Sequence, residues 1–150
     1  MTLRLGTLPR LWAIKGGICL LLANSTLQAQ TQQQVQQHIA SDIESGFNIM
    51  VNRQEGNCLT CHTLSDWGNQ TQRHKELGQQ GNFGPVLDGV GTRYNKTELL
   101  QWVTDARKIK PDTLMPPYGS LDGLNQPNAS RPLLTLEQRQ AVAAALSTLR

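Results

Sequence analysis

Three stretches of the chain place apolar residues at helical spacing, and no stretch alternates between apolar and polar positions as a strand does. The predicted helices run from Ser41 to Gln54, from Glu98 to Arg107, and from Thr135 towards the end of the chain. Their apolar faces are formed by Ile43, Phe47, Met50 or Val51; by Leu99, Leu100, Trp102 and Val103; and by Leu136, Val142, Ala145, Leu146 and Leu149. We therefore expect an all-α domain with three main helices.

Capping signals support the starts of these helices. Ser41 and Thr135 each begin a capping box, which for Thr135 is completed by Gln138, and Thr97 is the predicted cap of the second helix. Gly46 lies inside the first helix, where glycine costs about 1 kcal/mol relative to alanine. Its presence there predicts close packing against another part of the chain.

Long irregular segments separate the helices. Residues 63–94 are rich in Gly, Asn and Gln, and residues 112–132 are punctuated by Pro and Gly. A long loop without structure is unusual in a compact domain. We therefore expect these segments to wrap around a bound group that supplies the apolar surface they lack.

The first 29 residues have the layout of a secretory signal peptide. A basic start with Arg4, Arg10 and Lys15 is followed by an apolar run, 18–23, and a cleavage site after Ala29. An uncleaved membrane anchor is the alternative, but the apolar run is shorter than the about 20 residues that a spanning helix needs. A glutamine-rich arm, 30–40, is expected to be disordered, and the domain proper to occupy 41–150.

Removing the signal peptide changes the charge of the protein. The whole chain has 14 Lys and Arg against 11 Asp and Glu, and the signal peptide holds three of the basic residues and none of the acidic ones. The mature chain is therefore formally neutral, which gives no support for nucleic-acid binding.

The chemistry lies in the run Cys58-Leu59-Thr60-Cys61-His62. Cys-x-x-Cys-His is the attachment motif of haem c, in which two thiols form thioethers with the porphyrin and the histidine binds the iron. A redox dithiol would normally open a helix in a strand–helix–strand unit, and a zinc site would need two more ligands. The remaining cysteine, Cys19, lies in the signal peptide. We predict one covalently bound haem c held by Cys58 and Cys61, with His62 as an iron ligand.

Met115 is the favoured second iron ligand. It lies in a proline-rich loop, Leu114-Met115-Pro116-Pro117-Tyr118, and a thioether on a stiff loop is how electron-transfer cytochromes close the iron and raise its potential. The other candidates are Met50, which is expected in the core, His38 in the arm, and His74 in a polar stretch. His74 is the second choice.

Further residues are candidates for supporting roles. Pro85, in Gly84-Pro85-x-Leu87, is expected to offer its carbonyl to the second nitrogen of the His62 ring, which would fix the ring orientation. Tyr94, Trp102 and Tyr118 are expected to pack on the haem or to hydrogen-bond its propionates, although ordinary core packing explains them equally well.

These segments together resemble one family. The runs 56–62 (Gly-Asn-Cys-Leu-Thr-Cys-His), 84–94 (Gly-Pro-Val-Leu-Asp-Gly-Val-Gly-Thr-Arg-Tyr) and 115–119 (Met-Pro-Pro-Tyr-Gly) are similar to those of SoxX, the monohaem subunit of the SoxXA cytochromes. The similarity covers Ser41 to the C-terminus and excludes the arm. It implies a class I cytochrome c-like domain with long loops around one haem, and His62 and Met115 as its axial ligands.

The resemblance also implies a function. A periplasmic SoxXA complex oxidatively couples thiosulfate to a cysteine of a carrier protein, a reaction of the L-cysteine S-thiosulfotransferase type. SoxA carries the active site, and SoxX is a non-catalytic subunit that passes electrons to a downstream cytochrome. The alternatives are a free-standing electron shuttle for another periplasmic enzyme and a ligand-binding haem protein with an open iron.

Overall fold

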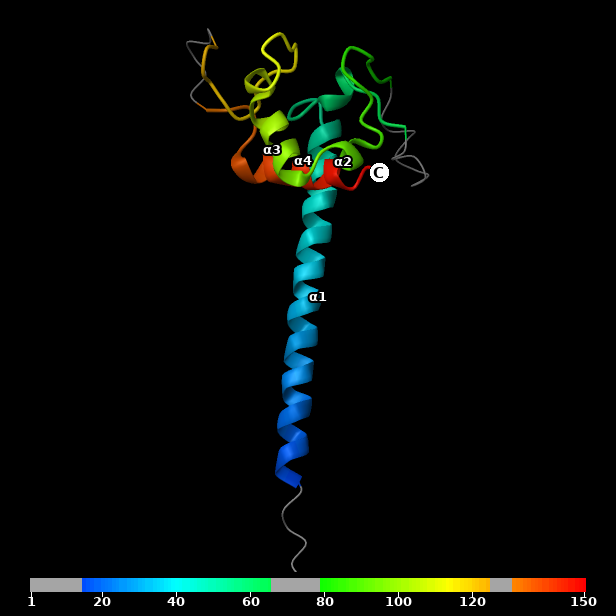
Figure 1. The fold of residues 1–150 in the computed structure, drawn as a ribbon, viewed down its shortest axis with the longest axis vertical. Helices are drawn as coiled ribbons and strands as arrows, with labels where there is room; N and C mark the ends of the chain where they lie inside the picture. Colours follow the sequence, from blue (N-terminus) through cyan, green and yellow to red (C-terminus); the bar gives the residue numbers. More distant parts are fainter. Residues whose placement is uncertain (1–14, 66–78, 125–130) are drawn as a thin grey trace, which may run out of the picture. The chain divides into compact units, whose positions relative to one another are not determined.

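The computed structural model describes residues 15–65, 79–124 and 131–150, with side chains from residue 27 onward. Its elements are α1 (Lys15–Val51), η1 (Cys58–Thr60), α2 (Val90–Arg93), α3 (Lys96–Asp105), η4 (Ala106–Lys108) and α4 (Leu136–Ser147), as Figure 1 shows. The described residues contain no strand, which confirms the predicted all-α class. The chain divides into two compact units, 1–38 and 39–150, and the site described below lies in the second.

The first helix is much longer than its sequence pattern predicts. It begins at Lys15 rather than at Ser41, and it includes the segment 30–40, for which the sequence predicts disorder. The reason is local: residues 18–45 contain neither Gly nor Pro, and Gln and Ala are good helix formers. None of the described helices combines the length and apolar character needed to cross a membrane.

Gly46 lies where α1 meets α4. A β-carbon added to it would lie 2.8 Å from the Ala145 β-carbon and would overlap the Ala141 carbonyl oxygen. The close packing that glycine predicts at this position is therefore confirmed, and it is against α4.

The caps of the two shorter helices follow from their sequences, with one correction. Asn95, not Thr97, caps α3: its side chain accepts from the backbone N–H groups of Thr97 and Glu98, and the Glu98 carboxylate accepts in return from the Asn95 N–H at 2.7 Å. This Asn-x-x-Glu capping box begins the helix one residue before Thr97. The Thr135–Gln138 capping box of α4 is present as predicted.

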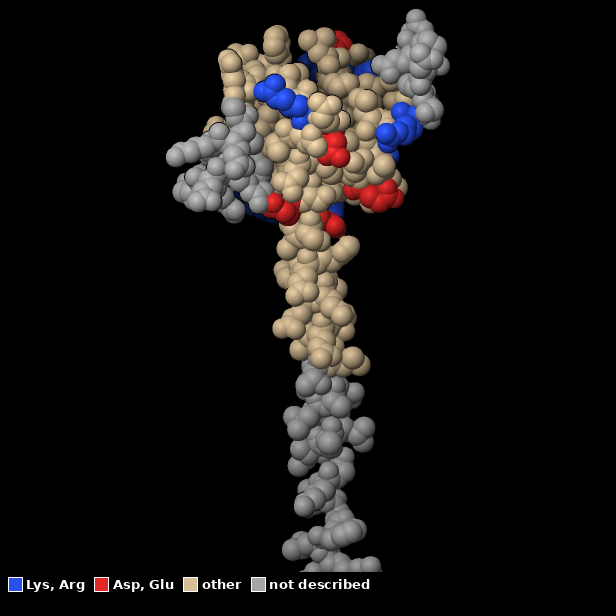
Figure 2. Space-filling model, turned by 180° about the vertical axis from the view of Figure 1, so that it is seen from behind, with Lys and Arg blue, Asp and Glu red and all other residues tan. Residues whose placement is uncertain are grey.

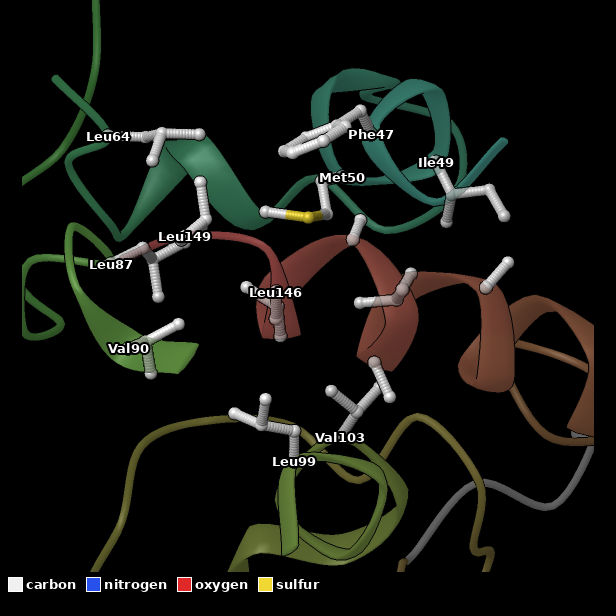
Figure 3. Close-up of a cluster of buried hydrophobic side chains, with 14 of the residues drawn as sticks. Phe47, Ile49, Met50, Leu64, Leu87, Val90, Leu99, Val103, Leu146 and Leu149 are labelled. Atoms are coloured by element: carbon white, nitrogen blue, oxygen red, sulfur yellow. The ribbon is translucent and has the colours of Figure 1, made fainter. Parts of the chain in front are cut away.

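The core of the second unit is built around α4. Helices α2 and α3 both pack on α4, and in Figure 3 the side chains of Leu99 and Val103 point from α3 towards it. Met50 is only 1% exposed, so its predicted place in the core is confirmed. The buried apolar cluster consists of Phe47, Ile49, Met50, Leu59, Leu64, Leu87, Val90, Leu99, Val103, Tyr118, Leu134, Ala141, Val142, Ala143, Ala145, Leu146 and Leu149.

Charged side chains of both signs are interspersed on the face shown in Figure 2. The described residues on this face therefore form no field of a single sign that would steer a charged partner.

Candidate functional site

A mainly apolar cavity of about 530 Å³ lies beside the core. Its volume is within the range of about 300–1,000 Å³ that is usual for cofactor and ligand sites. All eight site residues predicted from the sequence line it, together with core residues from α1, α3 and α4: Cys58, Cys61, His62, Pro85, Tyr94, Trp102, Met115 and Tyr118. The fold therefore brings together residues that are up to 60 positions apart in the chain.

The segment that carries the two cysteines is a tight turn. Asn57 adopts a left-handed conformation with φ 48°, which asparagine tolerates better than most residues, and its side chain accepts from the Thr60 hydroxyl. The N–H groups of Cys61 and His62 both donate to the Cys58 carbonyl, at 3.1 and 3.0 Å. This 3₁₀ turn places both thiols and the imidazole on one cavity.

The two thiols differ in environment. Neither is in a disulfide; Cys61 is exposed and Cys58 is half-buried. Burial of the Cys58 sulfur raises its pKa to about 11 in the absence of a bound group. At neutral pH the Cys58 side chain is therefore a protonated thiol.

The His62 ring is held from two sides. Its Nδ1 lies 2.7 Å from the Pro85 carbonyl oxygen, so Nδ1–H is the donor, and in the neutral ring Nε2 is then the nitrogen that carries the lone pair. A β-carbon on Gly84 would lie 2.6 Å from Nδ1 and 2.8 Å from Nε2, so only glycine fits against the ring. This is the arrangement of a metal-binding histidine whose orientation is fixed by a backbone acceptor.

The loop that presents Pro85 is laid along the attachment segment by backbone hydrogen bonds. Gly81 comes so close that an added β-carbon would overlap the Thr60 carbonyl oxygen. Three N–H groups donate to carbonyls of the attachment segment: Gly81 to Leu59 (2.9 Å), Gly84 to Cys61 (2.8 Å) and Leu87 to Thr63 (2.9 Å). The glycines of this irregular stretch are thus needed for close backbone contact.

Arg93 supports the same loop, a role that was not recognised from the sequence. Its guanidinium donates to the carbonyls of Val86 (3.1 Å) and Asp88 (3.0 Å), directly after Pro85. It is placed there by α2, whose Gly91 N–H donates to the Leu149 carbonyl at 2.8 Å. The one signal for this role in the sequence is the arginine itself, within the run 84–94 that resembles SoxX.

Met115 lies in the loop between α3 and α4. It is half-buried and packs against the core cluster, while its N–H donates to the Thr113 hydroxyl at 3.2 Å. Further along the same loop, the Tyr118 hydroxyl donates to the Gly56 carbonyl at 2.7 Å. Burial raises the pKa of Tyr118 well above its usual value, so this hydroxyl remains a donor.

The other candidate ligands are placed differently. Met50 lines the cavity as well as the core, and His38 lies on α1 in the first unit, residues 1–38. His74 falls outside the described residues. Within the described part of the chain, no group of three or more His, Cys, Asp or Glu side chains could hold a metal ion.

The remaining aromatic residues form a pair. The rings of Tyr94 and Trp102 meet edge to face, with centroids 6.0 Å apart and an interplanar angle of 63°. Since both line the cavity, the pair forms part of its wall.

An ion pair braces the end of α3. The Arg107 guanidinium donates to both carboxylate oxygens of Asp105, at 2.8 and 2.9 Å, and also to the Asp122 carbonyl at 2.8 Å. This hydrogen-bonded guanidinium lowers the pKa of Asp105. The pair thereby fixes the loop that follows Met115 to the end of α3.

The helical fold and the cavity define a cytochrome c-like domain, all-α in its described residues. No family model and no curated protein matches the chain. The structure is, however, similar to a chain of the crystal structure of SoxXA from P. pantotrophus, with a TM-score of 0.62 and 29% sequence identity, over 71% of this chain and 80% of that chain. The chain is thus similar to a SoxX-type subunit, which confirms the resemblance seen in the sequence.

Proposed function

We propose that this protein is a periplasmic monohaem c-type cytochrome, the electron-transfer subunit of a SoxXA-type complex that oxidatively couples thiosulfate to a carrier-protein cysteine. One observation carries the proposal. His62 directly follows the Cys58–Cys61 pair, has its Nδ1 bound to the Pro85 carbonyl, and shares an apolar cavity with Met115.

The residues present fit a covalently bound haem. Two unpaired thiols on one 3₁₀ turn line an apolar cavity of about 530 Å³, next to an imidazole with one free nitrogen. A thioether sulfur from a distant loop lines the same cavity. Two thiols, an imidazole and a thioether are the set of groups that a six-coordinate haem c requires.

Each residue then has a defined part. A haem bound here supplies a one-electron couple at its iron. Cys58 and Cys61 would hold the haem covalently, and His62 would bind its iron through Nε2 while the Pro85 carbonyl fixes the ring. Met115 would supply a second iron ligand, and the apolar walls would exclude water. With the iron held by both residues, electron transfer would require little movement of ligands.

The sulfur chemistry would take place on a partner. When Cys58 and Cys61 carry haem, the mature chain retains no cysteine to hold a persulfide, because Cys19 lies in the proposed signal peptide, 1–29. The partner is accordingly a SoxA-type cytochrome subunit in a heterodimer, and a downstream cytochrome accepts the electrons. Cleavage of the signal peptide would leave the protein in the periplasm.

The test of haem attachment is direct. Mature protein, produced with haem-attachment machinery, is expected to be coloured, to retain its haem after denaturation, and to resist alkylation at Cys58 and Cys61. The Cys58→Ser/Cys61→Ser double variant is the control and should lose haem on denaturation. A colourless wild-type protein with two reactive thiols would refute the proposal.

The axial ligand is tested by comparing the two methionines that line the cavity. We expect Met115→Ala to lose the charge-transfer band between methionine sulfur and iron, to bind carbon monoxide when reduced, and to have a lower potential. Met50→Leu conserves volume and should change none of these. The reverse pattern would make Met50 the ligand, and no change in either variant would direct attention to His74.

The complex is tested by purification from the native host. A subunit of a SoxXA-type complex should remain with a second cytochrome through gel filtration. Elution alone would instead favour a free-standing electron shuttle.

A further inference from the structure

Tyr118 joins two loops that the proposed function requires to act together. Its side chain is 8% exposed, and its hydroxyl donates at 2.7 Å to the carbonyl of Gly56, which is 62 positions earlier in the chain. Gly56 is separated from Cys58 by one residue, and Tyr118 from Met115 by two prolines. This buried hydrogen bond therefore connects the haem-attachment segment with the methionine loop.

The Gly56 end of this connection is fixed. Its N–H donates to the Ile49 carbonyl at 3.1 Å, and an added β-carbon would lie 2.6 Å from that oxygen. Gly56 is thus pressed against the last turn of α1. The acceptor of the Tyr118 hydroxyl cannot move without displacing the core.

The methionine end is stiff for a different reason. Pro116 and Pro117 lock two backbone φ angles between Met115 and Tyr118. Backbone hydrogen bonds hold the far side of the loop: the Tyr118 carbonyl accepts from Leu134 at 2.9 Å, and the next N–H in the chain, at Gly119, donates to the Thr104 carbonyl at 2.9 Å. A shift at the Tyr118 side chain would therefore be transmitted to Met115.

We propose that Tyr118 is a positioning residue, which holds Met115 in register with the attachment segment through its hydrogen bond to Gly56. Its role is to keep the sulfur in place in the cavity that His62 lines. This inference rests on the proposed function, in which Met115 is an iron ligand. Tyr118 itself need not touch the iron.

The experiment compares Tyr118→Phe with the wild type and with Ser147→Ala in mature, haem-loaded protein. Ser147 does not line the cavity, and its hydroxyl donates to the Ala144 carbonyl at 2.7 Å, so Ser147→Ala also removes a side-chain-to-backbone hydrogen bond. The measurements are the affinity of the reduced protein for carbon monoxide, which competes with the sixth ligand, and the methionine–iron band of the oxidised protein. In Tyr118→Phe the buried Gly56 carbonyl loses its hydrogen-bond donor, and this loss weakens the hold on Met115. We therefore expect the affinity for carbon monoxide to rise about tenfold or more.

The result that supports the inference is tighter carbon monoxide binding and a weaker methionine band in Tyr118→Phe, with Ser147→Ala unchanged. If Tyr118→Phe only melts at a lower temperature and binds carbon monoxide like the wild type, Tyr118 has a structural role alone and the inference is overturned. Equal effects in both variants overturn it as well. Rapid carbon monoxide binding by the wild type would instead reject Met115 as ligand, and this role of Tyr118 with it.

A second variant covers the case in which Tyr118→Phe does not fold. Pro116 is exposed, and Pro116→Gly leaves the Tyr118 hydroxyl in place but loosens the link to Met115. We expect the same direction of change in carbon monoxide affinity. Wild-type affinity in Pro116→Gly would show that the loop transmits no constraint to Met115, and would overturn the inference.

Discussion

Replacing Gly46 by alanine sets two physical effects against each other. Alanine in a helix interior is about 1 kcal/mol more favourable than glycine, so helix propensity alone predicts a more stable protein. The structure predicts the opposite, because the new β-carbon would overlap the Ala141 carbonyl oxygen and lie 2.8 Å from the Ala145 β-carbon. The sign of the change in unfolding free energy therefore shows whether helix propensity or steric overlap dominates.

The expected size follows from what has to move. Extra atoms in a well-packed core cost about 1–3 kcal/mol. Here the obstacle is backbone of α4, which cannot rotate away as a side chain could, so the cost should lie in the upper part of that range. After the propensity gain is subtracted, Gly46→Ala should lower the free energy of unfolding by about 1–2 kcal/mol.

Urea unfolding of the haem-loaded protein, followed by circular dichroism, measures this change. Thermal unfolding should show a fall in Tm of about 4 °C or more. Ser45→Ala is the matched control, because Ser45 is exposed on the same turn, and it should leave stability equal or slightly increased. If Gly46→Ala proves as stable as Ser45→Ala, the contact between α1 and α4 is not as tight as we infer.

Three further predictions concern the site and its supports. Gly84→Ala should displace the His62 ring from its backbone acceptor. The midpoint potential of the haem should then rise, because the imidazole becomes a poorer electron donor to ferric iron. An unchanged potential in a redox titration would contradict this. The lowered pKa of Asp105 beside Arg107 contributes stability above the unfolded pKa of about 3.9, which is lost as the pH falls through the folded value. Asp105→Asn should therefore reduce the difference in urea midpoint between pH 6 and pH 3. In protein made without haem attachment, Cys58 should be alkylated more slowly than the exposed thiol, and faster as the pH approaches its pKa of about 11; equal rates at pH 7 would count against its burial.

The parts of the site that the sequence predicted are those encoded by short runs of residues. The attachment motif specifies a chemistry by its spacing, and Met115 and Pro85 each lie in a run whose prolines or glycine limit the backbone. The structure brings all of them to one cavity. Their roles as ligands and supports remain predictions.

The parts that could not be predicted depend on contacts between distant segments. Tyr118 could be singled out as an aromatic residue, but nothing in the sequence indicates that its hydroxyl meets Gly56. Arg93 is likewise uninformative until the fold shows that its guanidinium binds two carbonyls of the Pro85 loop. The early start of α1 is not evident from the sequence for a different reason: the glutamine-rich segment has weak apolar periodicity, although it is free of helix breakers.

The irregular character of the segment before α2 follows from what it does. A helix in this segment would turn its backbone groups inward and could not donate N–H groups from Gly81 and Gly84 to the attachment turn. Side chains larger than hydrogen at these two positions would collide with the turn or with the His62 ring. The lack of periodicity and the abundance of glycine therefore have one cause. This segment must lie flat against the attachment turn so that the carbonyl of Pro85 reaches the His62 imidazole. Because the Pro85 carbonyl occupies Nδ1, the nitrogen of His62 that is left for the proposed haem iron is Nε2.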